Sequence, residues 1–132
     1  MSPKQTVQKE QYAKAIEKLR IVLHEKKTEV VRDSAIQRFE ICADLAWKVL
    51  KTYLDEKHGV VCRSPKGCFR EAFSLGVIDY SDFWLEIIDL RNLTVHTYNE
   101  KLAEEIFKKL PKALGYFEDL CTRLKPVPIL TK

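Results

Sequence analysis

The chain is poor in the residues that build tight turns and closed sheets. Its 132 residues include only 4 glycines and 5 prolines, so many tight turns and long loops are excluded. No apolar stretch approaches the ~20 residues of a membrane-spanning helix, and the polar N-terminus does not resemble a secretion signal. Leucine, lysine, glutamate and alanine are abundant instead, which favours helices over a sandwich or barrel. We therefore expect an all-α, cytoplasmic protein that does not enter the membrane.

The cysteines form no metal-binding pattern. Cys42, Cys62, Cys68 and Cys121 contain no CxxC pair and share no zinc-ligand spacing with a histidine. Cys42 and Cys121 fall on apolar helix faces and are expected in the core, whereas Cys62 and Cys68 flank a loop and could be exposed. A reducing cytosol is the simplest setting. The chain also lacks GxGxxG, Walker, GxSxG and HExxH motifs, so we expect no metal and no cofactor.

Charge of both signs is mixed along the chain. The 23 basic and 19 acidic residues give a net charge of +4, which permits contact with nucleic acid without arguing for it. Trp47 and Trp84 could stack bases, but their amphipathic placement favours a core or dimer-interface position. Four cations could line a basic groove or form a solvated helix face, and the sequence favours neither reading: Arg38, Lys48, Lys51 and Arg70.

Apolar residues recur at steps of three and four along most of the chain, which is the period of amphipathic helices. Helices are predicted over residues 9–26, 30–57, 65–75, 82 to 95 or 96, and from 100 to about 124. The short connections predict a single domain over residues 1–132, folded as an antiparallel, up-down bundle of four or five helices. The tail from about residue 126 to 132 contains two prolines and is predicted to be irregular.

Local signals set the predicted helix ends. Gly59 is a natural stop for the second helix, whose start is ambiguous because Asp33 could cap a shorter helix. Caps are expected at Ser64, at Asp79 or Ser81, and at Asn99. Pro111 lies inside the last periodic segment, so it must kink that helix or divide it in two.

Polar residues gather where the fourth predicted helix ends. Arginine can bind a phosphate through its planar fork of donors, and histidine exchanges protons near neutral pH. Together Arg91 and His96 could grip and cleave a phosphodiester without a metal. The alternative is that Arg91 pairs with Asp89 or another acid while His96 caps the helix. The cluster comprises Asp89, Arg91, Asn92, Thr94, His96, Thr97, Tyr98 and Asn99.

Helical geometry constrains this site. Arg91 and His96 are five residues apart and would point ~140° away from each other on a straight helix. They converge only if the helix ends or distorts near His96, or if a second subunit completes the site. The spacing therefore favours a site at a helix end within a dimer.

The motif and the surrounding sequence resemble a known family. Arg91, His96 and Tyr98 fit the Arg-x4-His-x-Tyr form of the HEPT superfamily. Over about residues 35–110 the sequence is similar to the branch called nucleotidyltransferase substrate-binding proteins. The matching positions are 37–40, 45–51, 64–65, 70–73, 76–78, Trp84, 91–94, 96–98 and 103–106. The departures are Lys57-His58 and the run 41–44, where an aromatic and Glu are more usual. Both are expected to lie away from the motif.

The resemblance implies a helical bundle that dimerises, with a minimal nucleotidyltransferase as partner in a toxin–antitoxin pair. It implies a metal-independent ribonuclease with Arg91 and His96 as catalytic residues, silenced when the transferase attaches AMP to Tyr98. On this hypothesis Asn92 positions the phosphate and Asp89 orients Arg91. A competing reading is a non-catalytic subunit that binds a nucleotide or other substrate for the transferase. A third is a dimeric scaffold whose polar cluster only caps a helix.

Overall fold

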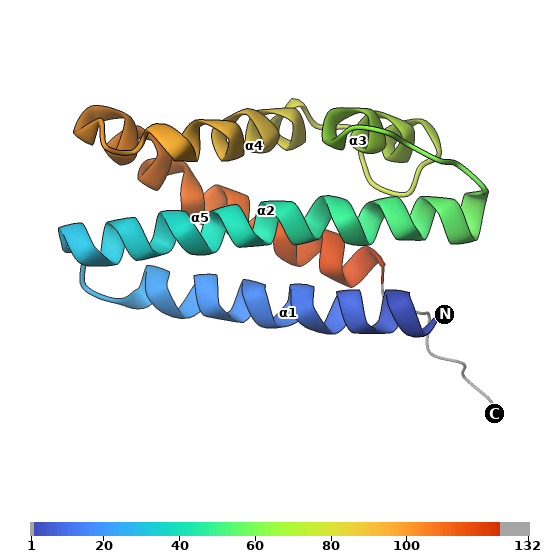
Figure 1. Cartoon of the computed structure of the whole chain (residues 1–132), viewed down its shortest axis with the longest axis horizontal. Helices are drawn as coiled ribbons and strands as arrows, with labels where there is room; N and C mark the ends of the chain where they lie inside the picture. Colours follow the sequence, from blue (N-terminus) through green and yellow to red (C-terminus); the bar gives the residue numbers. More distant parts are fainter. Residues whose placement is uncertain (1, 125–132) are drawn as a thin grey trace.

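A computed structural model describes residues 2–124. Those residues form five α-helices and one 3-10 turn, with no strand, which confirms the predicted all-α bundle. The chain runs up and down: α1 and α2 lie antiparallel, α3 and α4 follow end to end along the other side of α2, and α5 returns behind them (Figure 1). The elements are α1 (Pro3–His24), α2 (Glu29–His58), α3 (Pro65–Ser74), α4 (Asp82–Leu93), η1 (Thr94–His96) and α5 (Glu100–Arg123). The tail predicted to be irregular, about 126–132, lies outside the described residues.

Each helix begins at a side-chain oxygen that accepts a hydrogen bond from a backbone N–H of the first turn. Two of these caps correct the predicted boundaries. Ser2, with Pro3 at the first helical position, starts α1 well before residue 9, and Thr28 rather than Asp33 caps α2. Gly59 ends α2 as predicted, in the left-handed conformation at φ 66°. The remaining caps are Ser64, Ser81 and Asn99.

Helix α5 continues through Pro111 without a break, so the alternative in which this proline divides the helix is wrong. Pro111 has no N–H to donate to the carbonyl four residues earlier, and its own ring is exposed. The buried side chains on both sides of it, Leu110 and Ala113, pack into the same core. Tertiary packing therefore holds the two halves in one helix.

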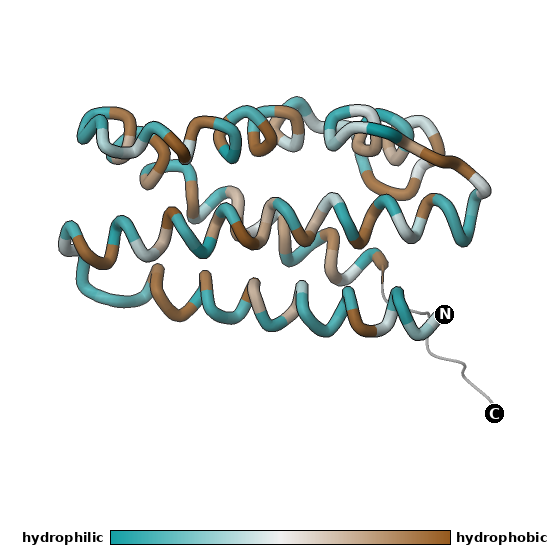
Figure 2. The backbone as a smooth tube through the Cα atoms, in the orientation of Figure 1, coloured by the Kyte–Doolittle hydropathy of each residue, from teal (hydrophilic) through white to brown (hydrophobic). Residues whose placement is uncertain are grey.

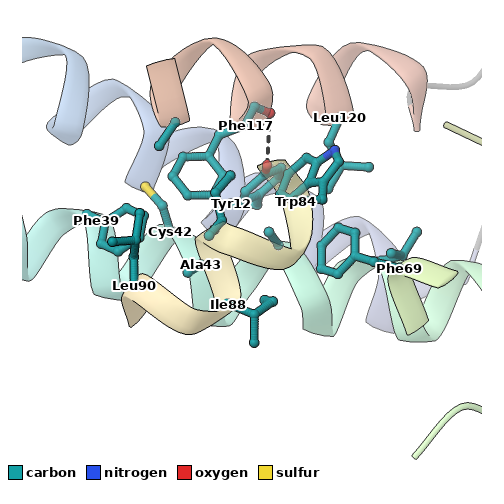
Figure 3. Close-up of a cluster of buried hydrophobic side chains, with 14 of the residues drawn as sticks. Tyr12, Phe39, Cys42, Ala43, Phe69, Trp84, Ile88, Leu90, Phe117 and Leu120 are labelled. Carbon is teal, nitrogen blue, oxygen red and sulfur yellow. Dashed lines mark hydrogen bonds between the residues drawn. The ribbon is translucent and has the colours of Figure 1, made fainter. Parts of the chain in front are cut away.

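Large aromatic side chains fill the core. Hydrophobic positions recur along each helix and alternate with hydrophilic ones, which is the predicted amphipathic pattern (Figure 2). Tyr12 of α1 is buried and donates its hydroxyl to the Phe117 carbonyl oxygen at 2.8 Å (Figure 3). Trp84 is 2% exposed and stacks on Phe69 with ring centroids 4.4 Å apart, so its predicted core position is confirmed. Trp47 is half-buried against the core.

Cys62 and Cys68 depart from the expectation of exposed thiols. Both are buried, and they form a disulfide that joins the α2–α3 connector to α3. The loop expected to expose them is instead tied to the first turn of α3. Cys42 is buried as predicted, and Cys121 is half-buried against the core. Within residues 2–124, no helix combines the length and apolar character needed to cross a membrane.

Candidate functional site

The predicted polar cluster lies where α4 ends and the chain turns into α5 (Figure 1). Side-chain hydroxyls add hydrogen bonds to the backbone there: Thr94 Oγ1 donates to the Arg91 carbonyl at 2.7 Å, and Thr97 Oγ1 donates to the Thr94 carbonyl at 3.1 Å. The residues tighten into a 3-10 turn over Thr94–His96, and Asn99 then caps α5. The helix therefore ends near His96. This is one of the two conditions under which Arg91 and His96 were expected to converge, the other being a second subunit.

Two carboxylates of α2 hold Arg91. Its Nε lies 2.7 Å from Asp44 Oδ1, its Nη2 lies 3.1 Å from Asp44 Oδ2, and its Nη1 lies 3.0 Å from Glu40 Oε2. The first pair of bonds is the bidentate fork that fixes a guanidinium plane. These bonds raise the pKa of Arg91, chiefly through Asp44, so the side chain stays positively charged.

The partners of Arg91 correct two predictions. Asp89 does not orient Arg91, because its carboxylate pairs with Lys66 at 2.7 Å. Two residues along a helix turn a side chain by ~200°, so Asp89 points away from the α2 face that Arg91 meets. The 41–44 run was expected to lie away from the motif, yet Asp44 contacts Arg91 directly.

Sequence reasoning missed Glu40 and Asp44 as part of the site. The available signal was their spacing of four residues, which places both carboxylates on one face of α2. Nothing in the local sequence shows that this face meets α4. Arg91 is separated from Asp44 by 47 residues, and only the packing of the two helices joins them.

His96 and Tyr98 form an exposed pair on the turn after α4. His96 Nδ1 lies 3.3 Å from the Tyr98 hydroxyl, and the two rings meet edge to face with centroids 5.9 Å apart. The Tyr98 side chain is 81% exposed. The imidazole is therefore open to solvent and to a ligand, and the tyrosine hydroxyl is open to an enzyme.

The motif residues do not all meet within one chain. Among residues 2–124, no hydrogen bond or ion pair joins Arg91 to His96. Asn92 is exposed beside Arg91, with its side chain in no hydrogen bond to the described residues. The surface around the turn also exposes Leu93 and Val95. Arg91 thus faces α2, while His96 and Tyr98 face solvent at the end of the bundle.

This arrangement of helices and motif is that of a HEPT-type bundle, and comparison with known families agrees. The family model described as "Nucleotidyltransferase substrate binding protein like" matches residues 8–126. The chain belongs to this family, within the HEPT superfamily.

Two relatives extend the comparison. A Haemophilus influenzae protein named "Probable ribonuclease HepT" is 30% identical over 80 residues, which are 58% of this chain and 55% of that protein. The match thus spans about half the length of the curated relative. A Thermus thermophilus protein of known crystal structure is 41% identical with a TM-score of 0.82, covering 87% of this chain and 99% of that one.

Proposed function

We propose that this protein is a metal-independent ribonuclease with Arg91 and His96 as catalytic residues, silenced when a minimal nucleotidyltransferase adenylylates Tyr98. The observation that carries the proposal is the solvent-exposed His96–Tyr98 pair, 3.3 Å apart, on the turn that ends α4. The name of the H. influenzae relative supports the ribonuclease half. The description of the matching family supports the nucleotidyltransferase half.

The chemistry needs one base and one cation. The His96 imidazole takes the proton from an RNA 2′-hydroxyl, whose oxygen attacks the adjacent phosphorus. The bond from phosphorus to the 5′-oxygen breaks, and that oxygen takes up a proton from solvent water. The products are a 2′,3′-cyclic phosphate and a 5′-hydroxyl. On this proposal Arg91 stabilises the charge on the equatorial phosphorane oxygens, and Asn92, which is exposed, donates a hydrogen bond to the same phosphate.

Adenylylation of Tyr98 would block this reaction at short range. The Tyr98 hydroxyl attacks the α-phosphorus of ATP, pyrophosphate leaves, and the tyrosine keeps AMP as a phosphodiester. The new group carries a negative charge and the bulk of a nucleotide, and it is attached at an atom 3.3 Å from His96 Nδ1. It would repel an incoming RNA phosphate and occupy its volume.

A second candidate function follows from the pairing of Arg91. Asp44 accepts hydrogen bonds from two of its N–H donors, Glu40 forms an ion pair with its Nη1, and the two carboxylates balance its charge within the chain. A guanidinium so paired can fix a ligand without driving phosphoryl chemistry. On this reading the protein is a non-catalytic subunit that binds a nucleotide or other substrate for its transferase.

The ribonuclease proposal is tested by incubating purified protein with total RNA in EDTA and following cleavage on a gel. Wild-type protein should cleave, whereas His96→Ala and Arg91→Ala should not. His58→Ala is the matched control, because His58 is an exposed histidine at the end of α2, outside the motif. Cleavage by His96→Ala would overturn the catalytic role of His96. No cleavage by a folded wild-type protein would favour the binding subunit, which calorimetry with nucleotides would then examine.

The regulatory half has its own test. Wild-type protein, Tyr98→Phe and Tyr80→Phe are incubated with the nucleotidyltransferase, ATP and Mg²⁺, and the mass of each intact chain is measured. Tyr80 is 68% exposed and serves as the control for accessibility alone. AMP should appear on wild-type protein and Tyr80→Phe only. AMP on Tyr98→Phe would show that another residue is the acceptor.

A further inference from the structure

A shallow groove runs between α1 and α2, on a different part of the surface from the motif. It contains two hollows that follow one another along the helix pair, which lies side by side in Figure 1. One hollow lies between Lys4 and Gln8 of α1 and Lys48 of α2. The other lies between Lys14 and Lys18 of α1 and Arg38 of α2. Hereafter the α1–α2 groove means these two hollows together.

Both hollows lie on the same side of α1. Lining residues 4, 8, 11, 15 and 18 recur at steps of three and four, so they share one face of that helix. From residue 4 to 18 this face is about 21 Å long. The two hollows are therefore segments of one continuous strip.

The groove carries unpaired positive charge. Six cations line it: Lys4, Lys14, Lys18, Arg38, Lys48 and Lys51. None of them makes an ion pair with any residue from 2 to 124. The acids Asp55 and Glu56 line only the Lys4 end. With six cations and only these two acids among its lining residues, the strip holds a local excess of positive charge in a protein of net charge +4.

The floor of the groove is apolar and partly open. Ile41, Leu45 and Trp47 are half-buried and line it from α2. Lys51 lies over the Trp47 ring, with its ammonium 5.2 Å from the ring centroid. Cations at the edges and apolar or aromatic surface at the floor are what single-stranded nucleic acids require, because phosphates need positive charge and unpaired bases need surface to cover.

The groove passes close to the candidate site. Arg38, Ile41 and Leu45 occupy the same turns of α2 as Glu40 and Asp44, which hold Arg91 from the other side of that helix. A helix with its side chains is about 10–12 Å across. A strand lying in the groove thus passes within about one helix width of Arg91.

We propose that the α1–α2 groove binds the backbone of single-stranded RNA and delivers it to the Arg91 side of α2. The proposal rests on RNA being the substrate, as in the proposed function. A polyanion is favoured over a second copy of the chain, because two such grooves would bring like charges together. Of the four cations named from the sequence, three line the groove, whereas Arg70 lies on α3 and lines neither hollow.

Binding is measured by fluorescence anisotropy with a short fluorescein-labelled oligouridine, using full-length protein that carries His96→Ala so that the strand stays intact. The groove variant adds Lys14→Gln, Lys18→Gln and Lys48→Gln. The control variant instead adds Lys26→Gln, Lys108→Gln and Lys112→Gln, which removes the same charge from exposed lysines outside the groove. Circular dichroism confirms that both variants are folded.

The groove variant should bind at least about tenfold more weakly at low salt, and its slope of log affinity against log salt should shrink by about 2, because three phosphate contacts are lost. The control should stay within about twofold of the parent. Equal weakening in both variants, or no binding by the parent, overturns the proposal. A groove variant that loses self-association but keeps its RNA affinity shows an interface between copies and also overturns it.

Cleavage separates this proposal from the ribonuclease proposal. The groove substitutions are also made in protein that retains His96, and RNA cleavage is measured at subsaturating RNA. If wild-type protein cleaves RNA and the groove variant cleaves as fast, the ribonuclease proposal stands and the groove proposal is overturned. If the protein binds oligouridine through the groove but cleaves no RNA, the groove proposal stands and the ribonuclease proposal is overturned.

Discussion

Asp44 accepts hydrogen bonds from two of the five N–H donors of Arg91, and Glu40 forms an ion pair with its Nη1. Within residues 2–124, the remaining donors are available to a ligand. The bidentate contact with Asp44 fixes the plane of the guanidinium, and with it the direction of the remaining donors. Because Arg91 and Asp44 are both partly solvent-exposed, this ion pair adds little to stability. Its main effect is on orientation, which makes Asp44 a positioning residue for Arg91.

Asp44→Asn should lower RNA cleavage by about 10- to 100-fold, because a misdirected catalytic group costs rate even when it remains present. The free energy of unfolding should change by less than about 1 kcal/mol. Single-turnover cleavage rates and urea unfolding curves check the two expectations. Glu118→Gln is the control, because Glu118 pairs with Arg20 between α1 and α5 at similar exposure. Unchanged cleavage, or a loss of stability as large as the loss of activity, would contradict the assignment.

At the scale of elements, the end of α4 and the start of α3 are built differently. The motif turn is held by local bonds of Thr94 and Thr97 and remains exposed. The start of α3 is held by a Ser64 cap and by the disulfide between the buried residues Cys62 and Cys68. The disulfide therefore restrains the start of α3, which meets α4 through the ion pair of Lys66 with Asp89. No covalent cross-link restrains the motif turn within residues 2–124.

Reduction of the disulfide should lower the free energy of unfolding by about 2 kcal/mol, the loop-entropy value for a cross-link between residues this close in sequence. RNA cleavage should be unchanged, because the motif turn has its own hydrogen bonds. Urea unfolding with and without a reducing agent measures the difference. A Cys62→Ala, Cys68→Ala variant should show no response to the reductant. A reductant-dependent stability loss in that variant, or no loss in wild type, would mean that the two cysteines are not paired in solution.

For the whole molecule, Arg32 links the two helix starts nearest the motif. It is buried at the start of α2 and bonds Glu100 at 2.7 Å and Glu104 at 3.0 Å, both at the start of α5. Lys27, in the α1–α2 connector, also pairs with Glu104. These contacts fix where α5 begins, and therefore where the turn that carries His96 and Tyr98 must end.

Arg32→Met should lower the midpoint of thermal unfolding by about 5 °C at pH 7, because three carboxylates then lose their shared cation. Lys27 and then Arg32 lower the pKa of Glu104 below its ordinary value of 4.5. A lowered folded pKa gives stability that is present above 4.5 and is lost as the pH falls through the folded value. The difference in unfolding midpoint between wild type and Arg32→Met should therefore become smaller below pH 4.5.

Calorimetry over a pH series measures this gap. Arg123→Met is the control, because Arg123 pairs with two carboxylates at the surface of the other end of α5. It should change the midpoint much less. A gap for Arg32→Met that is constant from pH 7 to below pH 4 would show that lost packing, and not lost ion pairs, causes the effect.

The sequence by itself determined the helices, most of their caps and the place of the motif. Gly59, Ser64 and Asn99 act through hydrogen bonds or backbone angles within a few residues. The spacing of apolar residues that predicts each helix is likewise a property of neighbouring positions in the sequence. Packing decided the rest: the hold of Asp44 on Arg91, the Cys62–Cys68 pair, the continuity of α5 through Pro111 and the strip of unpaired cations along α1 and α2. Such features depend on which helix faces meet, and residues 47 positions apart carry no local signal that they will become neighbours.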